Sequence, residues 1–326
     1  MNEILPLALK SVQFVGSRLA RPECVLCTRA GDVFASDRRG GVSHITPDGG
    51  HRIYAGATLD LSGPLHPNGI ALDRDGSFLI AHLVDGEGGL FRLYRDGRLI
   101  PVLRQVDGVD LHVTNFVLLD AQGRIWVTIS TRQCPRIKAF RPGVADGYIV
   151  LIDDRGARIV ADGLGFANEC RIDPSGQWLY VNETYARCLT RFRLADDGTL
   201  AQRELVTEFG PGEFPDGLAF DIQGGLWVTC ILSNRLIRID ADGTPVRLLD
   251  DNDPAHIQEV ELAYQAGKLS RALLDRKSWS KLAHISSIAF AGPQLDMAYF
   301  GVLLADRLPL IAMPVRGVPL VHWEWR

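Results

Sequence analysis

The chain alternates between short apolar runs and tight polar turns over most of its length. A typical stretch, FPDGLAFDIQGGLWVT from Phe214 to Thr229, has an apolar run, a turn at 222–224 and a second apolar run that contains an aromatic residue. Similar turns occur at 74–76, 121–123, 174–176 and 241–243. Asp and Gly suit such turns because they tolerate positive φ angles or satisfy free backbone amides. The pattern therefore predicts antiparallel hairpins of short strands.

These hairpins belong to a repeated unit. Alignment on the turns places six residues at the start of the first strand of each unit: Glu23, Asn68, Asn115, Asn168, Asp216 and Ser286. Successive positions lie 45 to 53 residues apart, except for the longer last interval. Strand-rich units of this period are typical of propeller blades. We predict an all-β fold, a six-bladed β-propeller that forms one domain over residues 1–326.

The last interval contains a segment of different character. Residues 256–284 are rich in Leu, Ala, Lys, Arg and Glu, which predicts a helical insertion at about 253–284, between blades 5 and 6, interrupted near Gly267. This insertion could be a lid over the channel mouth or the contact surface of a homo-oligomer. We also predict that the terminal stretch PLVHWEWR supplies a closing strand.

Composition narrows the function classes. The net charge is −4 and the basic residues are scattered, which argues against a nucleic-acid or anionic-membrane partner. No segment is apolar for long enough to cross a membrane, and the N-terminus lacks the features of a signal peptide, so we predict a cytoplasmic protein. Six cysteines are too sparse for a disulfide framework and are expected to be free, mostly buried thiols.

In a propeller the first strand of each blade lines the central channel, so the six aligned positions should form a ring near one mouth. Every member offers an oxygen atom. The carboxylates of Glu23 and Asp216, together with amide carbonyls, would suit calcium, magnesium or manganese. The alternative is that Asn and Asp begin strands only as turn formers. Their shared register in successive units favours a common site, and Asn68 and Ser286 are the members nearest to the turn explanation.

Loops that follow second strands should return to the same mouth. They carry His82, Arg132 and Tyr185, which we select with Asn68 as candidate substrate-binding residues. Arg132 suits an anionic group, and Tyr185 suits stacking or hydrogen bonding. The alternative for each is an ordinary solvated loop residue. There is no H-E-x-x-H, G-x-S-x-G or Walker motif that would indicate zinc-protease, serine-hydrolase or nucleotide chemistry.

Four stretches resemble the blade starts of the regucalcin/gluconolactonase (senescence-marker-protein-like) family, which includes diisopropyl-fluorophosphatase-like enzymes. They are ECVLCTRAGDVFASD, NFVLLDAQGRIWVT, ANECRIDPSGQWLYVN and FPDGLAFDIQGGLWVT, and the resemblance extends over about residues 20–315. It implies a six-bladed propeller with one catalytic divalent ion, calcium or else magnesium, manganese or zinc. The implied ligands are Glu23, Asn115, Asn168 and Asp216.

The sequence departs from this family at two places. The usual P-N-G at the third ligand is Ala167-Asn168-Glu169, and the Arg that sugar lactonases often place two residues before the second ligand is Val113. We expect a metal-dependent hydrolase that opens a small cyclic ester, with Asp216 as the base or the nucleophile. The alternatives are phosphotriesterase-like or non-hydrolytic chemistry on the same scaffold, or a non-enzymatic metal-binding propeller.

Overall fold

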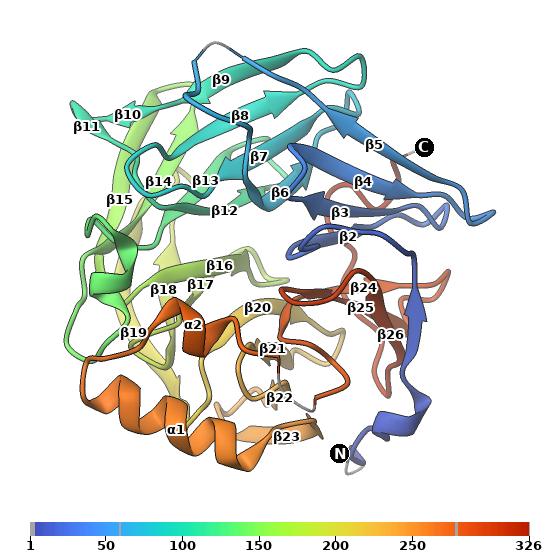
Figure 1. Cartoon of the computed structure of the whole chain (residues 1–326). Coiled ribbons are helices and arrows are strands. Elements are labelled where there is room, and N and C mark those ends of the chain that lie inside the picture. The colour runs from blue at the N-terminus through green and yellow to red at the C-terminus, as the bar shows by residue number, and fades with distance from the viewer. Residues whose placement is uncertain (1–3, 59, 278–279, 326) are drawn as a thin grey trace.

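The computed structural model describes residues 4–58, 60–277 and 280–325. Within these residues, six four-stranded antiparallel sheets are arranged around a central axis, as Figure 1 shows. The first strand of each sheet is innermost, and the later strands lie progressively farther out. The predicted six-bladed β-propeller is therefore confirmed.

The blades follow one another along the chain. Blade 1 contains β2 (Val25–Cys27), β3 (Val33–Asp37), β4 (Gly41–Ile45) and β5 (His51–Ala55). Blade 2 contains β6 (Pro67–Leu72), β7 (Phe78–His82), β8 (Gly89–Leu93) and β9 (Leu99–Leu103). Blade 3 contains β12 (Thr114–Leu119), β13 (Ile125–Ile129), β14 (Gly147–Asp153) and β15 (Gly156–Leu164). A small hairpin, β10 (Gln105–Val106) and β11 (Val109–Asp110), separates blades 2 and 3.

The second half of the chain continues the arrangement. Blade 4 contains β16 (Ala167–Ile172), β17 (Trp178–Glu183), β18 (Cys188–Leu194) and β19 (Leu200–Glu208). Blade 5 contains β20 (Pro215–Phe220), β21 (Leu226–Cys230), β22 (Arg235–Ile239) and β23 (Pro245–Asp250). Blade 6 contains β24 (Ile285–Ala291), β25 (Met297–Val302), β26 (Leu308–Ala312) and β1 (Gln13–Val15). Two short 3-10 helices are η1 (Leu9–Ser11) and η2 (Arg136–Ala139).

The N-terminal strand closes the propeller. β1 pairs antiparallel with β26, with Gln13 opposite Leu310 and Val15 opposite Leu308. The prediction that PLVHWEWR supplies a closing strand is wrong, because residues 319–325 form turns and unpaired chain; position 326 lies outside the described residues. β1 already occupies the edge of β26, and Pro319 lacks the N–H that a ladder needs.

The C-terminal segment instead covers the end of the axis opposite the six aligned positions. His322 and Trp323 are buried there. Together with the C-terminal ends of the first strands, the segment lines a cavity of about 340 Å³. Packing of the segment against these strand ends is favourable because an aromatic side chain removes a large apolar area from water when it is buried.

The aspartates of the repeated turns connect neighbouring strands. The Asp221 carboxylate accepts hydrogen bonds from the Gly225 amide (2.9 Å), Trp227 Nε1 (2.9 Å) and Arg238 Nε (2.7 Å). Asp120 accepts the same three kinds of bond in blade 3. Since Trp227 is fully buried, this carboxylate joins the turn to the blade core. The repeated aspartate therefore has a structural role, since it connects the turn to the core of its blade, and this role explains why it recurs.

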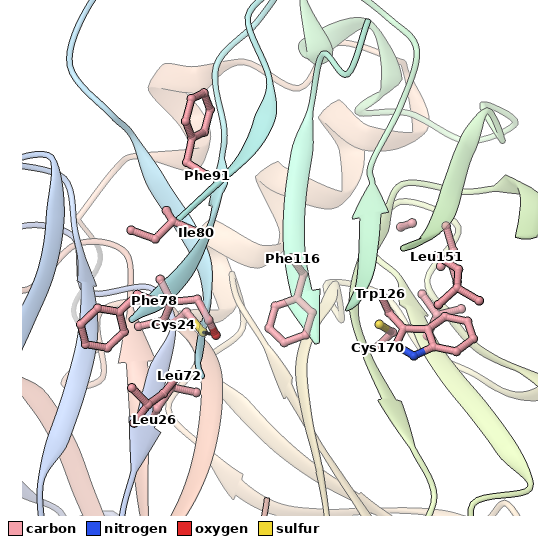
Figure 2. Packing of buried hydrophobic residues seen from close by; sticks show 14 of the residues in the cluster. Cys24, Leu26, Leu72, Phe78, Ile80, Phe91, Phe116, Trp126, Leu151 and Cys170 are labelled. Atoms are coloured by element: carbon pink, nitrogen blue, oxygen red, sulfur yellow. Dashed lines mark hydrogen bonds between the residues drawn. The ribbon is translucent and has the colours of Figure 1, made fainter. Parts of the chain in front are cut away.

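A continuous apolar core joins blades 1 to 4, and Figure 2 shows part of it, including Phe78, Phe116, Trp126 and Cys170. The six first strands contact one another in a closed circle, from β2 through β6, β12, β16, β20 and β24 back to β2. All six cysteines are free, and only Cys134 is exposed, as the sequence predicted.

Two helices, α1 (Pro254–Gln265) and α2 (Arg271–Leu274), lie between β23 and β24. Asp253 caps α1 by accepting the amides of Ala255 and His256, and Gly267, at φ +64°, follows its end. Positions 278 and 279 of the predicted insertion lie outside the described residues. No helix in the described part of the chain has the length and apolarity needed to cross a membrane.

The apolar face of α1 packs on its own chain. Val260 and Tyr264 are buried in one cluster with Phe214 and Tyr185, which belong to loops of blades 4 and 5. The Tyr264 hydroxyl donates to the Tyr185 carbonyl at 2.5 Å. This face is therefore used within the chain, while Leu262 is 67% exposed. Assembly through the insertion stays a prediction.

Candidate functional site

The six aligned residues occupy the same place in each blade. Five of them lie at the N-terminal end of a first strand, at a break in the pairing register with the second strand: Asn68, Asn115, Asn168, Asp216 and Ser286. Glu23 lies two residues before β2. A bulge re-aims the side chain that it carries and interrupts the ladder. Repeated in successive blades, it places five of these residues in one local conformation, and we call all six the ring.

The glycine that follows two ring residues permits close approach between blades. A Cβ at Gly217 would lie 2.5 Å from the Ser286 carbonyl oxygen, and a Cβ at Gly69 would lie 2.6 Å from Phe116 Cα. These first strands therefore touch through their backbones at the ring. In the blade of Asn168 the residue after the ring position is Glu169. This is the one blade of the six with a carboxyl side chain at that position.

A chain of hydrogen bonds joins three ring residues. Arg21 Nη1 donates to Glu23 Oε2 at 2.7 Å and to Asn68 Oδ1 at 3.2 Å. Asn68 Nδ2 donates to the carbonyl oxygen of Asn115 at 3.0 Å and to its Oδ1 at 3.2 Å. Arg21 has φ 47°, a left-handed conformation uncommon for a residue other than glycine. Glu23, Asn68 and Asn115 are thus held together through Arg21.

The other two candidate ligands are linked through blade 4. Asn168 Nδ2 donates to Thr184 Oγ1 at 3.0 Å, and that hydroxyl donates to the Pro215 carbonyl at 2.8 Å. Asn182 Nδ2 donates to the Asp216 carbonyl at 2.9 Å. Asn168 Oδ1 is buried and has no hydrogen-bond partner among the residues that the structure describes. A buried acceptor without a donor costs free energy, and a cation would satisfy it.

The electrostatics of Asp216 indicate that negative charge gathers at the ring. Burial raises the pKa of Asp216 well above its ordinary value, and the Glu23 and Glu169 carboxylates raise it further. Arg21 and hydrogen bonding with Asn168 oppose this rise. A divalent cation would relieve both the like-charge repulsion and the desolvation.

The donor set therefore fits a hard cation, provided that amide oxygens take part. Among the described residues no three His, Cys, Asp or Glu side chains group in a way that could hold a metal ion. A cation at the ring would depend on Glu23 and Asp216 together with the amide oxygens of Asn115 and Asn168. Such an all-oxygen set suits calcium, magnesium or manganese better than a thiophilic metal.

Glu169 is a buried carboxyl group that the sequence analysis did not select. Its Oε2 lies 3.1 Å from Arg171 Nη2 and accepts the Leu218 amide at 3.3 Å. Burial raises the pKa of Glu169 to about 7, although Arg171 and the Leu218 amide oppose the rise. The available signal was the replacement of P-N-G by Ala-Asn-Glu. Arg171 was a second signal, because side chains two residues apart in a strand share a face. Only the burial of this ion pair depends on tertiary structure.

The structure places the remaining ring member and the four candidate substrate contacts as follows. The Ser286 hydroxyl donates to the Glu23 carbonyl at 2.7 Å, so it braces the neighbouring blade. Asn68 is in the ring itself. His82 is buried, its Nδ1 accepts the His66 amide at 2.9 Å, and its Nε2 has no partner within the described chain. Burial lowers the pKa of His82 to about 4, which keeps the imidazole neutral.

Arg132 and Tyr185 have neighbours of different kinds. Arg132 makes two hydrogen bonds with the Asp162 carboxylate, at 2.8 and 2.9 Å, and its guanidinium lies 4.2 Å from the Tyr148 ring centroid. Those partners belong to the outer strands of blade 3. The ring of Tyr185 is buried and stacks on Phe140 at 4.4 Å. Burial raises the pKa of the Tyr185 hydroxyl, and a smaller effect comes from Asp216.

Known proteins match this chain in sequence and in fold. A family model described as the SMP-30/gluconolactonase/LRE-like region matches residues 22–250. A 6-deoxy-6-sulfogluconolactonase of Pseudomonas putida is 29% identical over 206 residues, which cover 56% of this chain and 66% of the relative. A pentonolactonase of Haloferax volcanii is 26% identical over 235 residues, which cover 71% of this chain and 65% of the relative. Both matches span slightly less than two thirds of the relative.

The solved structure of a calcium-binding protein, regucalcin, from Agrobacterium tumefaciens has the same fold. It superposes with a TM-score of 0.68 at 17% identity and covers 100% of both chains. At this identity the likeness shows the propeller alone. The family model, in contrast, covers well over half of the chain and includes five of the six ring residues. The chain therefore belongs to the SMP-30/gluconolactonase/LRE-like family.

Proposed function

We propose that the protein is a divalent-metal-dependent hydrolase that opens a small lactone. The observation that carries this proposal is the ring, where the carboxylates of Glu23 and Asp216 and the unpartnered Oδ1 of Asn168 lie at equivalent places in three blades. The family and the two lactonase relatives support the reaction class. The sulfogluconolactonase and the pentonolactonase carry names of sugar-derived lactonases, which supports an aldonolactone-like ring as substrate.

Glu23, Asn115, Asn168 and Asp216 would hold the cation. When bound, the ion would supply Lewis-acid polarisation of the lactone carbonyl. Arg21 fixes Glu23 and Asn68, and Asn68 in turn fixes Asn115, so this half of the ring is held in place before substrate binds. A preorganised site of this kind spends no free energy on reorienting its dipoles during the reaction.

Asp216 is the residue that can move a proton. The attacking water would give a proton to Asp216 Oδ, and the same carboxyl would return it to the ring oxygen that leaves. An amide can serve only as a ligand, which is why Asp216, unlike Asn115 or Asn168, can combine the two roles.

The experiment is a measurement of acid release from γ- and δ-lactones by protein treated with a chelator and by protein supplied with calcium or manganese. We expect metal-dependent release that the Asp216→Asn variant lacks. Release that is equal in chelated and supplemented samples would contradict metal dependence. Absence of release from every lactone, with calcium still raising the melting temperature, would favour a non-enzymatic calcium-binding propeller, which is the second candidate.

A further inference from the structure

The topology places several arginines on the same side of the propeller as the ring. First strands start at the ring and run away from it, and the antiparallel sheets return to it after second and fourth strands. Connections from strand two to three and from one blade to the next therefore lie on this face. Arg136 lies in the first kind of connection, on η2, and Arg271 lies in the second kind, on α2.

Arg136 is half-buried, yet no carboxylate among the described residues pairs with its side chain, whereas the unpaired Arg38 and Arg141 of such loops are exposed. Arg136 Nη1 lies 3.5 Å from the Leu83 carbonyl oxygen, which is longer than an ordinary hydrogen bond, and the Arg136 backbone amide donates to Asp85 Oδ1 at 3.0 Å. Within the described chain no carboxylate oxygen forms an ion pair with its guanidinium. The side chain is nevertheless half-buried.

Two neighbours show what a paired arginine looks like in this setting. Arg132, four residues earlier, makes two hydrogen bonds with Asp162. Arg187, in the corresponding loop of blade 4, pairs with Glu261 at 2.7 Å. Among the described residues only Nη1 of the Arg136 guanidinium has a hydrogen-bond partner, and none of its nitrogens is a fully buried atom without one, so its N–H donors are open to a ligand. The chemically matched partner is an oxyanion, which guanidinium groups bind in a bidentate manner.

The electrostatic neighbours of Arg136 locate it beside the ring. Burial lowers the pKa of Arg136, Asp85 and the more distant Glu23 raise it, and the Arg271 and Arg21 guanidinium groups lower it. Arg21 is committed to Glu23, and Arg271 is shared with Asp275 at 2.7 Å on the exposed side of α2. Of these three arginines, Arg136 is the one whose guanidinium pairs with no carboxylate within the described chain.

We propose that Arg136, with Arg271 as a second positive charge, binds an anionic substituent of the lactone, such as a phosphate, sulfonate or carboxylate group. This inference rests on the proposed lactonase function and adds a substrate class to it. The reacting carbonyl would lie over the ring, while the substituent would reach the η2 loop of blade 3. Recognition of this kind selects charged lactones over neutral ones of the same ring size, because a half-buried guanidinium forms stronger hydrogen bonds with a charged partner than with a neutral one.

The test compares two substrates that differ only in charge. The values of kcat/KM for glucono-δ-lactone and for its 6-phosphate are measured, above the spontaneous rate, for the wild type, Arg136→Gln and Lys138→Gln. Lys138 is an exposed cation of the same loop, and its Nζ donates to the Cys134 carbonyl at 2.9 Å, so its variant removes the same charge elsewhere. Arg136→Lys is a further variant that keeps the positive charge. A melting curve of each variant shows whether it is folded.

We expect Arg136→Gln to lower kcat/KM for the phosphorylated lactone by about 10- to 100-fold, with less than about a twofold effect on the neutral one. Lys138→Gln should change neither value by more than about twofold. A wild type without preference for the phosphorylated lactone, or an equal loss on both substrates in folded Arg136→Gln, would overturn the anion site while leaving the lactonase intact.

A binding measurement separates failure of the anion site from failure of the proposed function. Calorimetry with gluconate 6-phosphate and with gluconate needs no turnover. If no lactone is hydrolysed but gluconate 6-phosphate binds and Arg136→Gln weakens that binding, the lactonase proposal fails and the anion site stands. If the protein neither hydrolyses a lactone nor prefers gluconate 6-phosphate to gluconate, both proposals are wrong.

Discussion

The Glu23 carboxylate, just before the first strand of blade 1, raises the pKa of Asp216 in blade 5, although blade 6 separates the two blades. Burial is the larger cause, but the interaction shows that the two carboxylates share one low-dielectric region near the axis. Two like charges in one buried region destabilise the fold unless another group compensates them. Arg21 compensates Glu23 directly, and a divalent cation would compensate both.

The first prediction concerns Asp216. Replacement by Asn keeps one ligand oxygen but removes the base, so we expect turnover to fall by about 10²- to 10⁴-fold. In calcium-free protein the melting temperature should stay equal or rise, because the variant removes a buried carboxylate whose ionisation is unfavourable. Steady-state assays and melting curves on the same preparation check both expectations.

Ser286→Ala serves as the matched control at another ring position. The hydroxyl of Ser286 is engaged by the Glu23 carbonyl, so its loss should lower stability slightly and leave metal dependence in place. Turnover by Asp216→Asn equal to that of the wild type would remove Asp216 from the role of base.

The second prediction concerns metal removal. Calcium at 100 times its Kd should stabilise the wild type by about 2.7 kcal/mol, since it binds the folded state alone. Glu23→Gln should lose most of this stabilisation, because one of the two ligand carboxylates is neutralised. Melting curves with and without calcium give both values, and a calcium-dependent shift that survives in Glu23→Gln would place the ion elsewhere.

The third prediction concerns pH. The pKa of Glu169 is about 7 in the folded protein, above the ordinary value of 4.5, so the folded state holds a proton that the unfolded state has released. In chelator-treated protein, the contribution of Glu169 to the free energy of unfolding should fall as the pH rises from about 4.5 to about 7. Glu169→Gln lacks this contribution, so the free energy of unfolding of the wild type should fall relative to that of the variant across this window. Urea unfolding at several pH values measures it, and identical curves for both proteins would mean that Glu169 titrates normally.

The fourth prediction concerns the turn aspartates. Asp221→Ala leaves the buried Arg238 without its main partner and also removes acceptors for Gly225 and Trp227, so we expect a loss of about 3 to 5 kcal/mol. Asp173, the equivalent residue of blade 4, is half-buried and accepts no hydrogen bond from a Trp indole or an Arg side chain within the described part of the chain. Asp173→Ala should cost about 1 kcal/mol. Equal losses in denaturant unfolding would show that the buried ion pair contributes nothing extra.

The blades could be predicted from the sequence because each strand pair is a local unit. Apolar runs of strand length, Asp-Gly-type turns and a fixed register recur in every repeat, and six such units must close on one another to bury their faces. The same register identified Glu23 and Asp216 as members of one ring, although 193 positions separate them. The helical insertion was predictable from composition and from Gly267.

The positions of the two chain ends and of Tyr185 could not be predicted from local sequence patterns. The three residues of β1 have no clear strand pattern of their own, and they form a strand because they pair with the free edge of β26. The C-terminal stretch PLVHWEWR instead contributes to the lining of the cavity at one end of the channel. Tyr185 looked like a loop residue, yet α1 encloses it in an aromatic cluster.

Arg132 and Arg136, four residues apart, show what the sequence determines and what only the tertiary structure decides. Sequence alone determined that a basic loop follows the second strand of blade 3 and that this loop returns to the ring face, because antiparallel hairpins alternate direction. Only the tertiary structure decided that the Arg132 guanidinium pairs with Asp162 while the Arg136 guanidinium pairs with no carboxylate among the described residues. The partner of a long charged side chain depends on groups brought in from other parts of the fold, and those distances are set by packing, not by the order of residues in the chain.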